Sequence, residues 1–306
     1  MPKNQKQKVI AVVGPTASGK SGLGIFLAKK FGGEIISADS RQVYRGMDIG
    51  TGKVSKKEQR LAKHHLLDVA NPKKVFTVSD FKKLGQKAID DIVSHHKVPF
   101  VVGGTGFYVD ALIYNIAVPE VPPNKKLRAE LAKQPAEQLY KRLKKLDPVR
   151  ARNIDSKNKR RLIRALEIIK ATGKPVPKTA NGYSLMASRY NVLWLGIRPK
   201  DLSRKIKKRL DIRLKQGMIK EVKDLLKKWI SKKRLHDFGL EYRWVSQYLT
   251  RKIGYKEMKE GLLRDIIKYS KRQMTWFKTN KKIHWVKSSK EAEKLTRDFV
   301  RFPLEV

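Results

Sequence analysis

Cysteine is absent from the 306 residues of this chain, and acidic side chains and long apolar runs are scarce. Without cysteine there is no disulfide bond, no zinc-thiolate site and no thiol nucleophile. No stretch approaches the roughly 18 to 20 consecutive apolar residues that a membrane span needs. The first eight residues, MPKNQKQK, lack the apolar segment of a signal peptide. We therefore expect a soluble, cytoplasmic protein without a membrane partner.

Acidic residues are outnumbered: 28 Asp and Glu stand against 71 Lys and Arg, a formal net charge of +43. Hydrophobic residues still make up 40% of the chain, so it can fold into about two domains of roughly 150 residues each. A charge of this size indicates a polyphosphate partner, with a membrane surface as the weaker alternative. The excess is large in residues 119–200, which carry 21 basic and 6 acidic side chains, net +15.

Short apolar runs alternate along the chain with segments of helical periodicity. The predicted strands are residues 9–13, 34–38, 99–103, 192–197 and 283–286. The clearest predicted helices are residues 21–30, 126–146, 160–171, 202–230 and 255–277. Strands alternating with helices are typical of an α/β fold, in which a parallel sheet is flanked by helices.

The segment directly after the first predicted strand matches the phosphate-binding pattern G-x-x-x-x-G-K-[ST]. Its residues are Gly14, Pro15, Thr16, Ala17, Ser18, Gly19, Lys20 and Ser21. Backbone N–H groups and the start of the next helix can hold a pyrophosphate, Lys20 can neutralise its oxygens, and the Ser21 hydroxyl can bind Mg²⁺. The sheet core is therefore predicted to be of the P-loop type.

A proline-rich turn at residues 119–124 marks a domain boundary, because consecutive prolines cannot continue a helix or a central strand. We expect a discontinuous P-loop catalytic core formed by residues 1–118 and 200–306. An all-helical domain, residues 119–199, would be inserted into it. Its positive charge indicates that this insertion faces the polyanion.

The second acid of a nucleotide-hydrolysing P-loop enzyme is missing where it is expected. The strand at residues 99–103 runs into Gly103-Gly104-Thr105-Gly106, which contains no carboxylate and leaves room for a substrate channel. Asp39 instead follows the second predicted strand, at the sheet edge where ligands bind. Asp39 could act as the base on an acceptor in a group transferase, or it could cap a turn or a helix. The spacing leaves both roles open.

Several segments together resemble the tRNA dimethylallyltransferase family. They are residues 14–21, 37–44, 46–53, 64–68, 103–108, 160–167, 239–243 and 271–277, in the family's order and over nearly the whole chain. The resemblance implies transfer of the dimethylallyl group from dimethylallyl pyrophosphate to N6 of the adenosine 3′ of the anticodon. It further implies tRNAs that read codons starting with U, Mg²⁺ as cofactor, and a helical insertion that grips the anticodon stem-loop. No obligate protein partner is evident, and we expect a monomer.

The resemblance and the chemistry together suggest roles for individual residues. Asp39 would accept the N6 proton, while Thr16, Lys20 and Arg209 stabilise charge on the departing pyrophosphate. Arg209 matches a family arginine approximately, and a solvated helical arginine is the alternative. The residues expected to contact tRNA are Asp39, Ser40, Arg41, Gln42, Thr105, Arg128, Arg160, Arg161, Leu162, Ile163 and Arg164. Arg160 and Arg164 lie one helical turn apart, so they form either a phosphate-binding face or a solvated one.

Three other functions fit parts of this pattern. An isopentenyltransferase acting on free adenine nucleotide shares the loop, Asp39 and the prenyl donor, but it needs neither a charge of +43 nor a basic insertion. A P-loop small-molecule kinase would bind ATP instead of a prenyl donor. An RNA-binding protein that uses a nucleotide only as a switch would not depend on Asp39.

Overall fold

The computed structural model describes residues 6–176, 189–228 and 230–301. The chain forms two compact units: residues 1–112 with 189–306, which we call the sheet unit, and residues 113–188, which we call the helical unit. The predicted insertion at residues 119–199 overlaps the helical unit but ends too late. Residues 190–197 form a strand that pairs with the first strand of the sheet.

The sheet unit is built on a sheet of six parallel strands, in the order β3-β2-β4-β1-β5-β6. The strands are β1 (Gln7–Val13), β2 (Glu34–Ser37), β3 (His64–His65), β4 (Pro99–Gly103), β5 (Tyr190–Ile197) and β6 (Ile283–Val286). All five predicted strands are confirmed. The sequence missed β3, because two residues are too few to show a periodic pattern.

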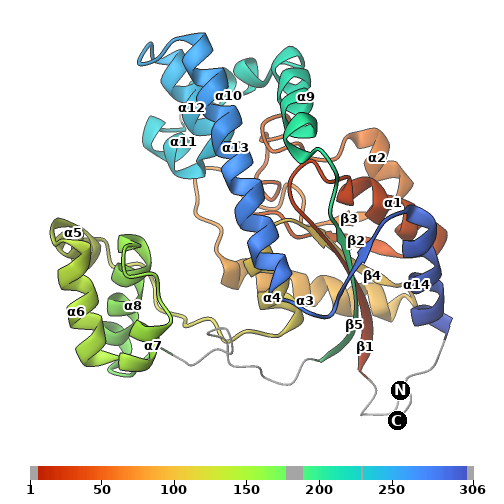
Figure 1. The fold of residues 1–306 in the computed structure, drawn as a ribbon, viewed down its shortest axis with the longest axis horizontal. Helices are drawn as coiled ribbons and strands as arrows, with labels where there is room; N and C mark the ends of the chain where they lie inside the picture. Colours follow the sequence, from red (N-terminus) through yellow and green to blue (C-terminus); the bar gives the residue numbers. More distant parts are fainter. Residues whose placement is uncertain (1–5, 177–188, 229, 302–306) are drawn as a thin grey trace. The chain divides into compact units, whose positions relative to one another are not determined.

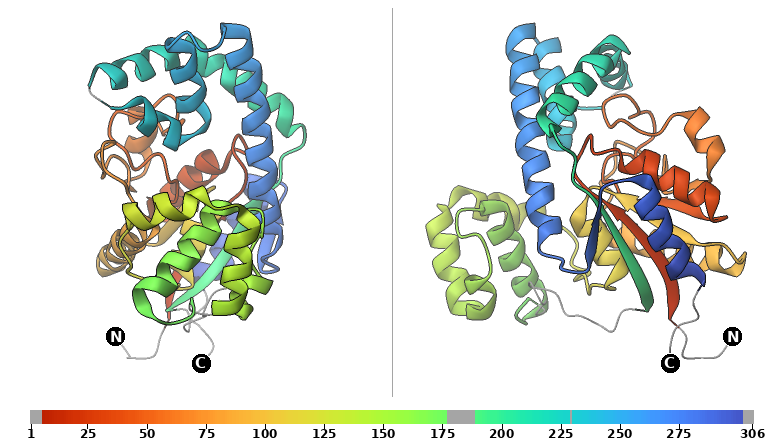
Figure 2. Two further views of the ribbon diagram at one scale, coloured as in Figure 1. Left: turned by 90° about the vertical axis from the view of Figure 1, so that its left-hand side faces the viewer. Right: turned by 45° about the vertical axis from the view of Figure 1, so that its right-hand side comes forward.

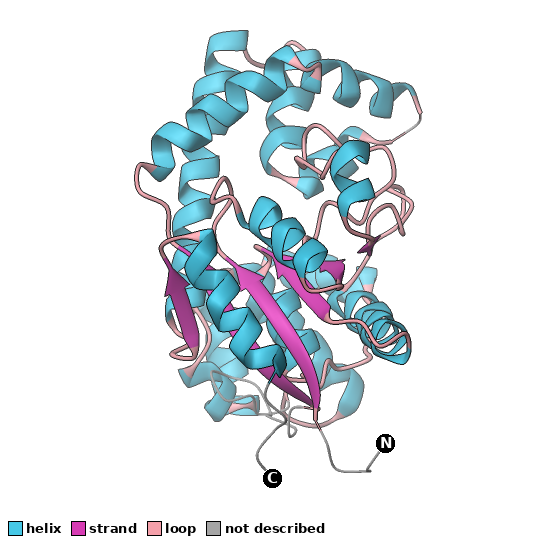
Figure 3. Ribbon diagram, turned by 90° about the vertical axis from the view of Figure 1, so that its right-hand side faces the viewer, coloured by secondary structure: helices cyan, strands magenta, loops and turns pink. Residues whose placement is uncertain are grey.

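Helices cover both faces of the sheet. The helices of this unit are α1 (Lys20–Lys30), α2 (Lys56–Leu61), α3 (Val78–Ser94), α4 (Gly106–Ile113), α9 (Leu202–Lys215), α10 (Met218–Lys227), α11 (Lys232–Phe238), α12 (Leu240–Leu249), α13 (Tyr255–Lys278) and α14 (Ser289–Arg301). α1 and α14 pack together on one face, and α3 lies on the other (Figures 1 and 3). α9 to α13 gather beyond the carboxyl ends of the strands (Figure 2).

Two predicted helices are each divided in two. Residues 202–230 form α9 and α10, because Gly217 takes a left-handed conformation with a φ of 98° and ends the first helix. Residues 126–146 divide at Pro135, which has no backbone N–H to donate within a helix. Trp229, at the end of the predicted range, lies outside the described residues.

Two of the apolar cores among the described residues of the sheet unit lie next to the elements discussed below. One lies between the sheet and α1 with α14, and it contains Val12, Phe100 and Leu195. The other lies among α9 to α13 and takes in the buried side chains of Tyr44 and Met47, which follow β2. This second core ties the loop after β2 to the helical cluster, so the residues of that loop are held in place at the sheet edge.

The helical unit has an apolar core of its own. Its helices are α5 (Lys125–Lys133), α6 (Ala136–Leu146), α7 (Pro148–Arg152) and α8 (Lys159–Thr172). Leu131, Leu139, Leu143 and Leu162 meet in this core. The described part of the unit is helical, as the sequence predicted. Across both units, no helix among the described residues is long and apolar enough to span a membrane.

Candidate active site

A cleft of approximately 820 Å³ opens in the sheet unit at the carboxyl edge of the sheet. Its lining comes from the phosphate loop after β1, the turn after β2, the end of β4, and the helical cluster. The predicted residues that line it are Thr16, Ala17, Ser18, Gly19, Lys20, Ser21, Asp39, Ser40, Arg41, Gln42 and Arg209. The structure therefore brings together nearly all the candidates that lie in the sheet unit.

The phosphate loop has free donors for an anion. α1 begins after Gly19 without a side-chain cap, so its first N–H groups remain available to a ligand. The buried hydroxyl of Ser18 also lacks a hydrogen-bond partner within the described residues. Gly14 and Pro15 do not line the cleft, but the Pro15 carbonyl accepts hydrogen bonds from Ser18 N and from Lys20 Nζ. This arrangement suits a pyrophosphate.

Lys20 lies among other positive charges. Burial lowers the pKa of Lys20 to about 8, helped by the nearby Arg209 and Arg213 and opposed by the carboxylate of Asp39. Its Nζ donates to the Pro15 carbonyl at 3.2 Å. An anion bound in the loop would restore full protonation of Lys20, because opposite charge favours the ammonium form.

Asp39 caps a turn and also faces the cleft. Its Oδ1 accepts hydrogen bonds from Arg41 N at 2.8 Å and from Gln42 N at 3.3 Å. The predicted capping role is therefore present, and the residue lines the cleft that holds the phosphate loop. Partial burial raises the pKa of Tyr269 to about 12, and the charge of Asp39 adds to this effect. The capping contacts therefore leave Asp39 at the cleft, a position that is compatible with the role of a base.

The residues after Asp39 have partners inside the protein. Ser40 N donates to Thr105 Oγ1 at 3.1 Å, and Thr105 also bonds the Tyr269 hydroxyl. The Arg41 guanidinium donates to the carbonyl of Phe238 at 2.9 Å. These contacts fix the turn against α13 and the end of α11. Thr105 does not line the cleft, but its hydrogen bond to Ser40 N holds a residue that does.

Arg209 reaches the phosphate loop from α9. Its Nη1 donates to Thr16 Oγ1 at 3.3 Å, and its Nη2 donates to the Gly52 carbonyl at 3.3 Å. Burial lowers the pKa of Arg209 to about 10, and the charge of Arg213 adds to this effect. The structure thus puts Arg209 beside the loop and not on a solvated helix face.

Among the cleft residues that sequence reasoning missed are Arg213, Glu241 and Gln273. Arg213 lies one helical turn after Arg209, is buried, and pairs with the buried Glu241 at 2.9 Å. Gln273 accepts from Thr16 N and donates to the Gly104 carbonyl, both at 2.8 Å. The four-residue spacing from Arg209 could have indicated Arg213. Nothing local in the sequence indicates the contacts of Gln273.

Gly103, the last residue of β4, lines the cleft, and both Gly103 and Gly104 lie close to other parts of the chain. A Cβ on Gly103 would come within 2.1 Å of the Ala38 carbonyl, and one on Gly104 within 2.4 Å of the Gln273 amide. The glycines are needed because the end of β2 and α13 approach the chain closely here. On the side of the missing Cβ atoms, the space is therefore taken by Ala38 and Gln273.

The predicted tRNA-contacting residues of the helical unit differ in their surroundings. Arg128 and Arg164 both bond the buried carboxylate of Glu167, each at 2.6 Å at the shortest. Burial alone would raise the pKa of Glu167, but these hydrogen bonds outweigh it and lower the pKa to about 2. Arg160 and Arg161 are exposed. Arg160 and Arg164 lie one turn apart on α8, as predicted, but the guanidinium of Arg164 turns towards Glu167.

Two apolar members of the same predicted set are packed within the protein. Leu162 is fully buried in the core of the helical unit, and Ile163 packs against that core. Their side chains stabilise α8 and do not offer a contact surface. Within this segment Arg160 and Arg161 are exposed and Arg164 is half-buried, so the two exposed arginines are the most accessible to a polyanion.

A metal ion in this cleft would be held largely by the phosphates of the bound substrate. The described residues contain no group of three His, Cys, Asp or Glu side chains that could hold a metal. Mg²⁺ often binds through one or two protein oxygens, together with substrate phosphates and waters. The Ser21 hydroxyl at the cleft wall fits that pattern.

A phosphate loop with Lys20, Arg209 and Arg213 beside it, and with Asp39 in the same cleft, has the features expected of a P-loop group transferase that acts on a phosphate ester. A family model described as IPP transferase matches residues 42–280. The chain belongs to this family.

Relatives and solved structures agree over almost the whole chain. A tRNA dimethylallyltransferase from Pelotomaculum thermopropionicum is 39% identical over 289 residues, which cover 93% of this chain and 92% of the relative. A tRNA dimethylallyltransferase 2 from Shewanella sediminis is 43% identical, and the match covers 92% of this chain and 93% of the relative. The crystal structure of a tRNA isopentenylpyrophosphate transferase from Bacillus halodurans superposes with a TM-score of 0.71 at 34% identity, covering 96% of each chain. The structure of a eukaryotic dimethylallyltransferase acting on tRNA superposes with a TM-score of 0.74 at 29% identity, and the match covers 88% of this chain and 69% of that one.

Proposed function

We propose that this protein transfers the dimethylallyl group of dimethylallyl pyrophosphate to N6 of the adenosine next to the anticodon on its 3′ side, in tRNAs that read codons starting with U. Family membership establishes the general reaction: the enzyme is a prenyltransferase that modifies tRNA by dimethylallyl transfer. The relatives do not support the alternatives of a free-nucleotide isopentenyltransferase or a small-molecule kinase.

One observation carries the assignment of the chemistry. Asp39 and the phosphate loop line the same cleft, at the ends of two strands that flank β4. The charge of Asp39 influences the pKa of Lys20, so the two side chains are close enough to interact. This shared cleft supports a base at the end of β2 and a pyrophosphate cradle at the end of β1, between which an acceptor would meet its donor.

Asp39 is proposed to take the proton of the attacking amine. The lone pair of an adenine N6 is delocalised into the ring, which makes the amine a poor nucleophile. Its attack forms the bond from N6 to the allylic carbon while the bond from that carbon to the pyrophosphate oxygen breaks. The proton that N6 loses would pass to the Asp39 carboxylate, a transfer worth about 10²- to 10⁴-fold in rate.

The departing pyrophosphate carries growing negative charge, and several donors are arranged to meet it. The N–H groups at the start of α1, the hydroxyl of Thr16, Lys20 and Arg209 all belong to the cleft. Fixed donors aimed at developing charge are usually the largest catalytic contribution. Ser21 is the residue that would hold Mg²⁺, which would neutralise further charge on the pyrophosphate when bound.

The tRNA is proposed to use both units. The adenosine must leave its stack to reach the cleft, because a base inside a stacked loop cannot approach a buried ester. The turn from Asp39 to Gln42 lies at the cleft and would contact the flipped nucleotide. The exposed Arg160 and Arg161 would contact phosphates of the anticodon stem. We further infer that the enzyme works as a monomer in the cytoplasm.

Mass spectrometry of nucleosides tests the proposal. Unmodified tRNA that reads a codon starting with U would be incubated with the enzyme, Mg²⁺ and dimethylallyl pyrophosphate, then digested. We expect one dimethylallyl group on the adenosine 3′ of the anticodon, and none when that adenosine is replaced by guanosine. Prenylation at another position, or modification of free AMP in preference to tRNA, would contradict the proposal.

A further inference from the structure

α9 presents a basic face to solvent beside the cleft. The side chains of this face recur every three or four residues, so they share one side of the helix. A shallow recess of approximately 420 Å³ lies on this side. Lys208 and Ile212 line both the recess and the cleft, so the two cavities are continuous. The residues that line the recess are Arg204, Lys207, Lys208, Asp211, Ile212 and Lys215.

The basic side chains of the recess have no ion-pair partner among the described residues. Among the described residues that line the recess, Asp211 alone is acidic. The ammonium group of Lys259 on α13 lies 2.8 Å from the Asp211 carboxylate and neutralises it. The positive charge of the recess is therefore left for a ligand.

This concentration of charge costs α9 stability. Its first turn, residues 202–205, carries Arg204 and Lys205 close to the positive end of the helix dipole. Arg204 and Lys208 are four residues apart, a spacing at which like charges repel. On α10 the chain uses the favourable arrangement, since the exposed Lys220 pairs with Asp224 at 2.9 Å. A face that only had to be soluble could carry such pairs, so the unpaired charge of α9 indicates an anionic partner.

The opposite face of α9 is anchored inside the cleft. Arg209 Nη2 donates to the Gly52 carbonyl at 3.3 Å, and Arg213 Nη1 donates to the Gly50 carbonyl at 3.2 Å. These two contacts fix the rotation of the helix about its axis, because both arginines are on the inner side. The basic face is therefore turned outwards.

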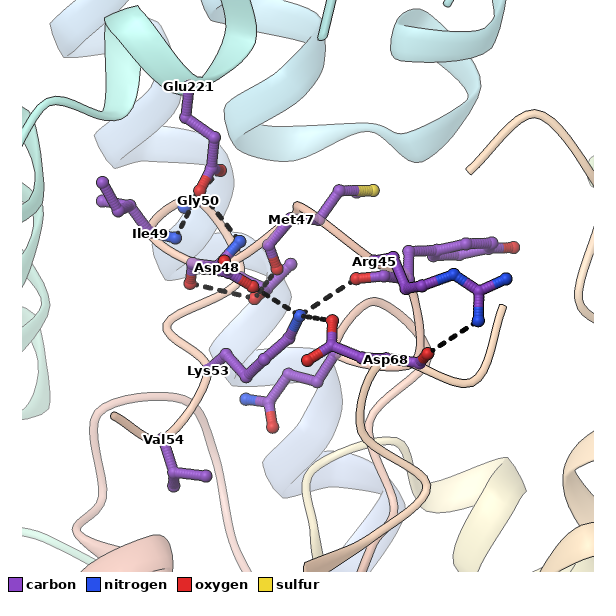
Figure 4. A network of polar contacts seen from close by, with 12 residues as sticks. Arg45, Met47, Asp48, Ile49, Gly50, Lys53, Val54, Asp68 and Glu221 are labelled. Carbon is purple, nitrogen blue, oxygen red and sulfur yellow. Dashed lines mark hydrogen bonds and ion pairs between the residues drawn. The ribbon is translucent and has the colours of Figure 1, made fainter. Parts of the chain in front are cut away.

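The loop that carries Gly50 and Gly52 is held in turn by α10. Glu221 accepts hydrogen bonds from the backbone N–H groups of Asp48 at 2.8 Å, Ile49 at 2.6 Å and Gly50 at 3.0 Å (Figure 4). A helix anchored to a fixed loop keeps its outer face in a constant position relative to the cleft. A surface that guides an extended ligand into the cleft needs such a fixed position.

A chain-like polyanion fits this face better than a small anion. Arg204 and Lys215, near the two ends of α9, are about 16 Å apart along the helix axis, a length over which a nucleic acid strand carries several phosphates. Lys208 lies between them and also lines the cleft. A strand whose base enters the cleft would therefore meet these side chains with its neighbouring phosphates. An anionic membrane would instead need a broad surface, whereas this charge follows one stripe of a helix beside a concave site.

We propose that the basic face of α9, formed by Arg204, Lys207, Lys208 and Lys215, binds the phosphates of the RNA strand next to the target adenosine. The proposal rests on the proposed function, since it takes the base in the cleft to belong to the anticodon loop of a tRNA. The face recognises backbone charge and no base sequence, because contacts to phosphates position a nucleic acid without reading it. It belongs to the same unit as the cleft, so it holds the strand beside the reacting groups.

Removing charge from the part of the face outside the cleft tests the proposal. The variant is Arg204→Gln/Lys207→Gln/Lys215→Gln, and Lys208 stays unchanged because it lines the cleft. Fluorescence anisotropy with an anticodon stem-loop RNA at several salt concentrations measures the dissociation constant of the full-length protein. We expect the slope of log affinity against log salt to become shallower by about 2, the effect of losing three phosphate contacts with a single strand. The affinity for inorganic pyrophosphate, measured by calorimetry, should not change.

The matched control removes the same charge elsewhere in the sheet unit. Lys29→Gln/Lys290→Gln/Lys294→Gln changes exposed positions on α1 and α14, which do not line the cleft or the recess. We expect this control to keep the slope of the wild type. If both triple variants flatten the slope equally, only the total charge matters and the proposal is overturned. An unchanged slope in the α9 variant would overturn it as well.

Two further outcomes separate this proposal from its alternatives. A wild-type enzyme that binds the stem-loop without prenylating it would refute the proposed function, while a shallower slope in the α9 variant would still support the RNA surface. Vesicles of phosphatidylcholine and phosphatidylserine probe the membrane alternative. If the wild type binds these vesicles, and the α9 variant loses vesicle binding but keeps RNA binding, the face is a membrane surface and the proposal fails.

Discussion

The side chain of Gln273 accepts a hydrogen bond from the backbone N–H of Thr16 at 2.8 Å, although 257 residues separate them. The same amide donates to the Gly104 carbonyl at 2.8 Å. One buried side chain on α13 thus joins the phosphate loop after β1 to the chain after β4. The shape of the loop depends on a helix that comes late in the sequence.

Replacing Gln273 by Leu should loosen the loop and destabilise the protein. The change leaves Thr16 N and the Gly104 carbonyl buried without a partner, at a cost of about 1 to 3 kcal/mol in the free energy of unfolding. We also expect weaker binding of dimethylallyl pyrophosphate. Denaturant unfolding and calorimetry would measure the two effects, with Gln216→Leu at the exposed end of α9 as the control. Identical behaviour of the two variants would refute the structural role of Gln273.

Glu221→Gln should release the loop that carries Gly50 and Gly52. The amide nitrogen would face backbone N–H groups that now donate to the carboxylate, so at least one hydrogen bond is lost. We expect the free energy of unfolding to fall by about 1 to 3 kcal/mol, with a parallel loss of affinity for pyrophosphate. Glu260→Gln on the exposed face of α13 is the matched control. A variant that keeps both properties would show that the loop is held by other contacts.

Affinity for dimethylallyl pyrophosphate should fall as pH rises above about 8. In the free protein the pKa of Lys20 is lowered to about 8, chiefly by burial, whereas the bound anion favours the charged ammonium. Binding above pH 8 therefore takes up a proton, and affinity drops up to tenfold per pH unit. The donor's own phosphates keep a constant charge in this range, because the second pKa of a phosphate monoester is about 6.

Calorimetry in buffers of different ionisation enthalpy would count the protons taken up at pH 8.5. Lys20→Arg should abolish this uptake, because a guanidinium stays charged throughout the range. Proton uptake that persists in Lys20→Arg, or an affinity that does not change between pH 7.5 and 9, would contradict the assignment to Lys20.

The two arginine pairs of the helical unit should respond differently to substitution. Arg160 and Arg161 are exposed, so replacing both with Gln should remove about two phosphate contacts and flatten the slope of log affinity against log salt by roughly 1.5. Arg164→Gln instead deprives the buried Glu167 of a partner and should lower stability. Filter binding of an anticodon stem-loop at several salt concentrations measures the slope. If Arg164→Gln flattened the slope and the double variant did not, the structural distinction between them would be wrong.

The parts of the site that were predictable from sequence are those whose signal is local. The phosphate loop can be recognised from the sequence because its glycines, Lys20 and Ser21 lie within eight consecutive residues between a strand and a helix. Asp39 could be placed at the sheet edge because it directly follows a strand. Pro135 and Gly217 were local signals of helix ends that the apolar periodicity outweighed.

The rest of the site depends on contacts between distant segments. Glu241 and Arg213 are 28 residues apart on different helices, and neither stands in a pattern that reveals the partner. The same is true of Gln273, whose two partners lie near the start and the middle of the chain. In the helical unit, Arg164 lies on the helix face that the periodicity predicts, but the tertiary contact with Val121 and the neighbouring Glu167 decide where its guanidinium goes.

The central claim is that Asp39 removes the proton of the attacking amine opposite the phosphate loop, and a single-turnover measurement with Asp39→Asn tests it most directly. Asparagine keeps the Oδ1 that accepts from Arg41 N and Gln42 N, so the turn is preserved while the base is lost. With enzyme, dimethylallyl pyrophosphate and tRNA preassembled, we predict a transfer rate about 10²- to 10⁴-fold below that of the wild type, and affinities for both substrates within a few fold. A wild-type transfer rate in Asp39→Asn would contradict the account.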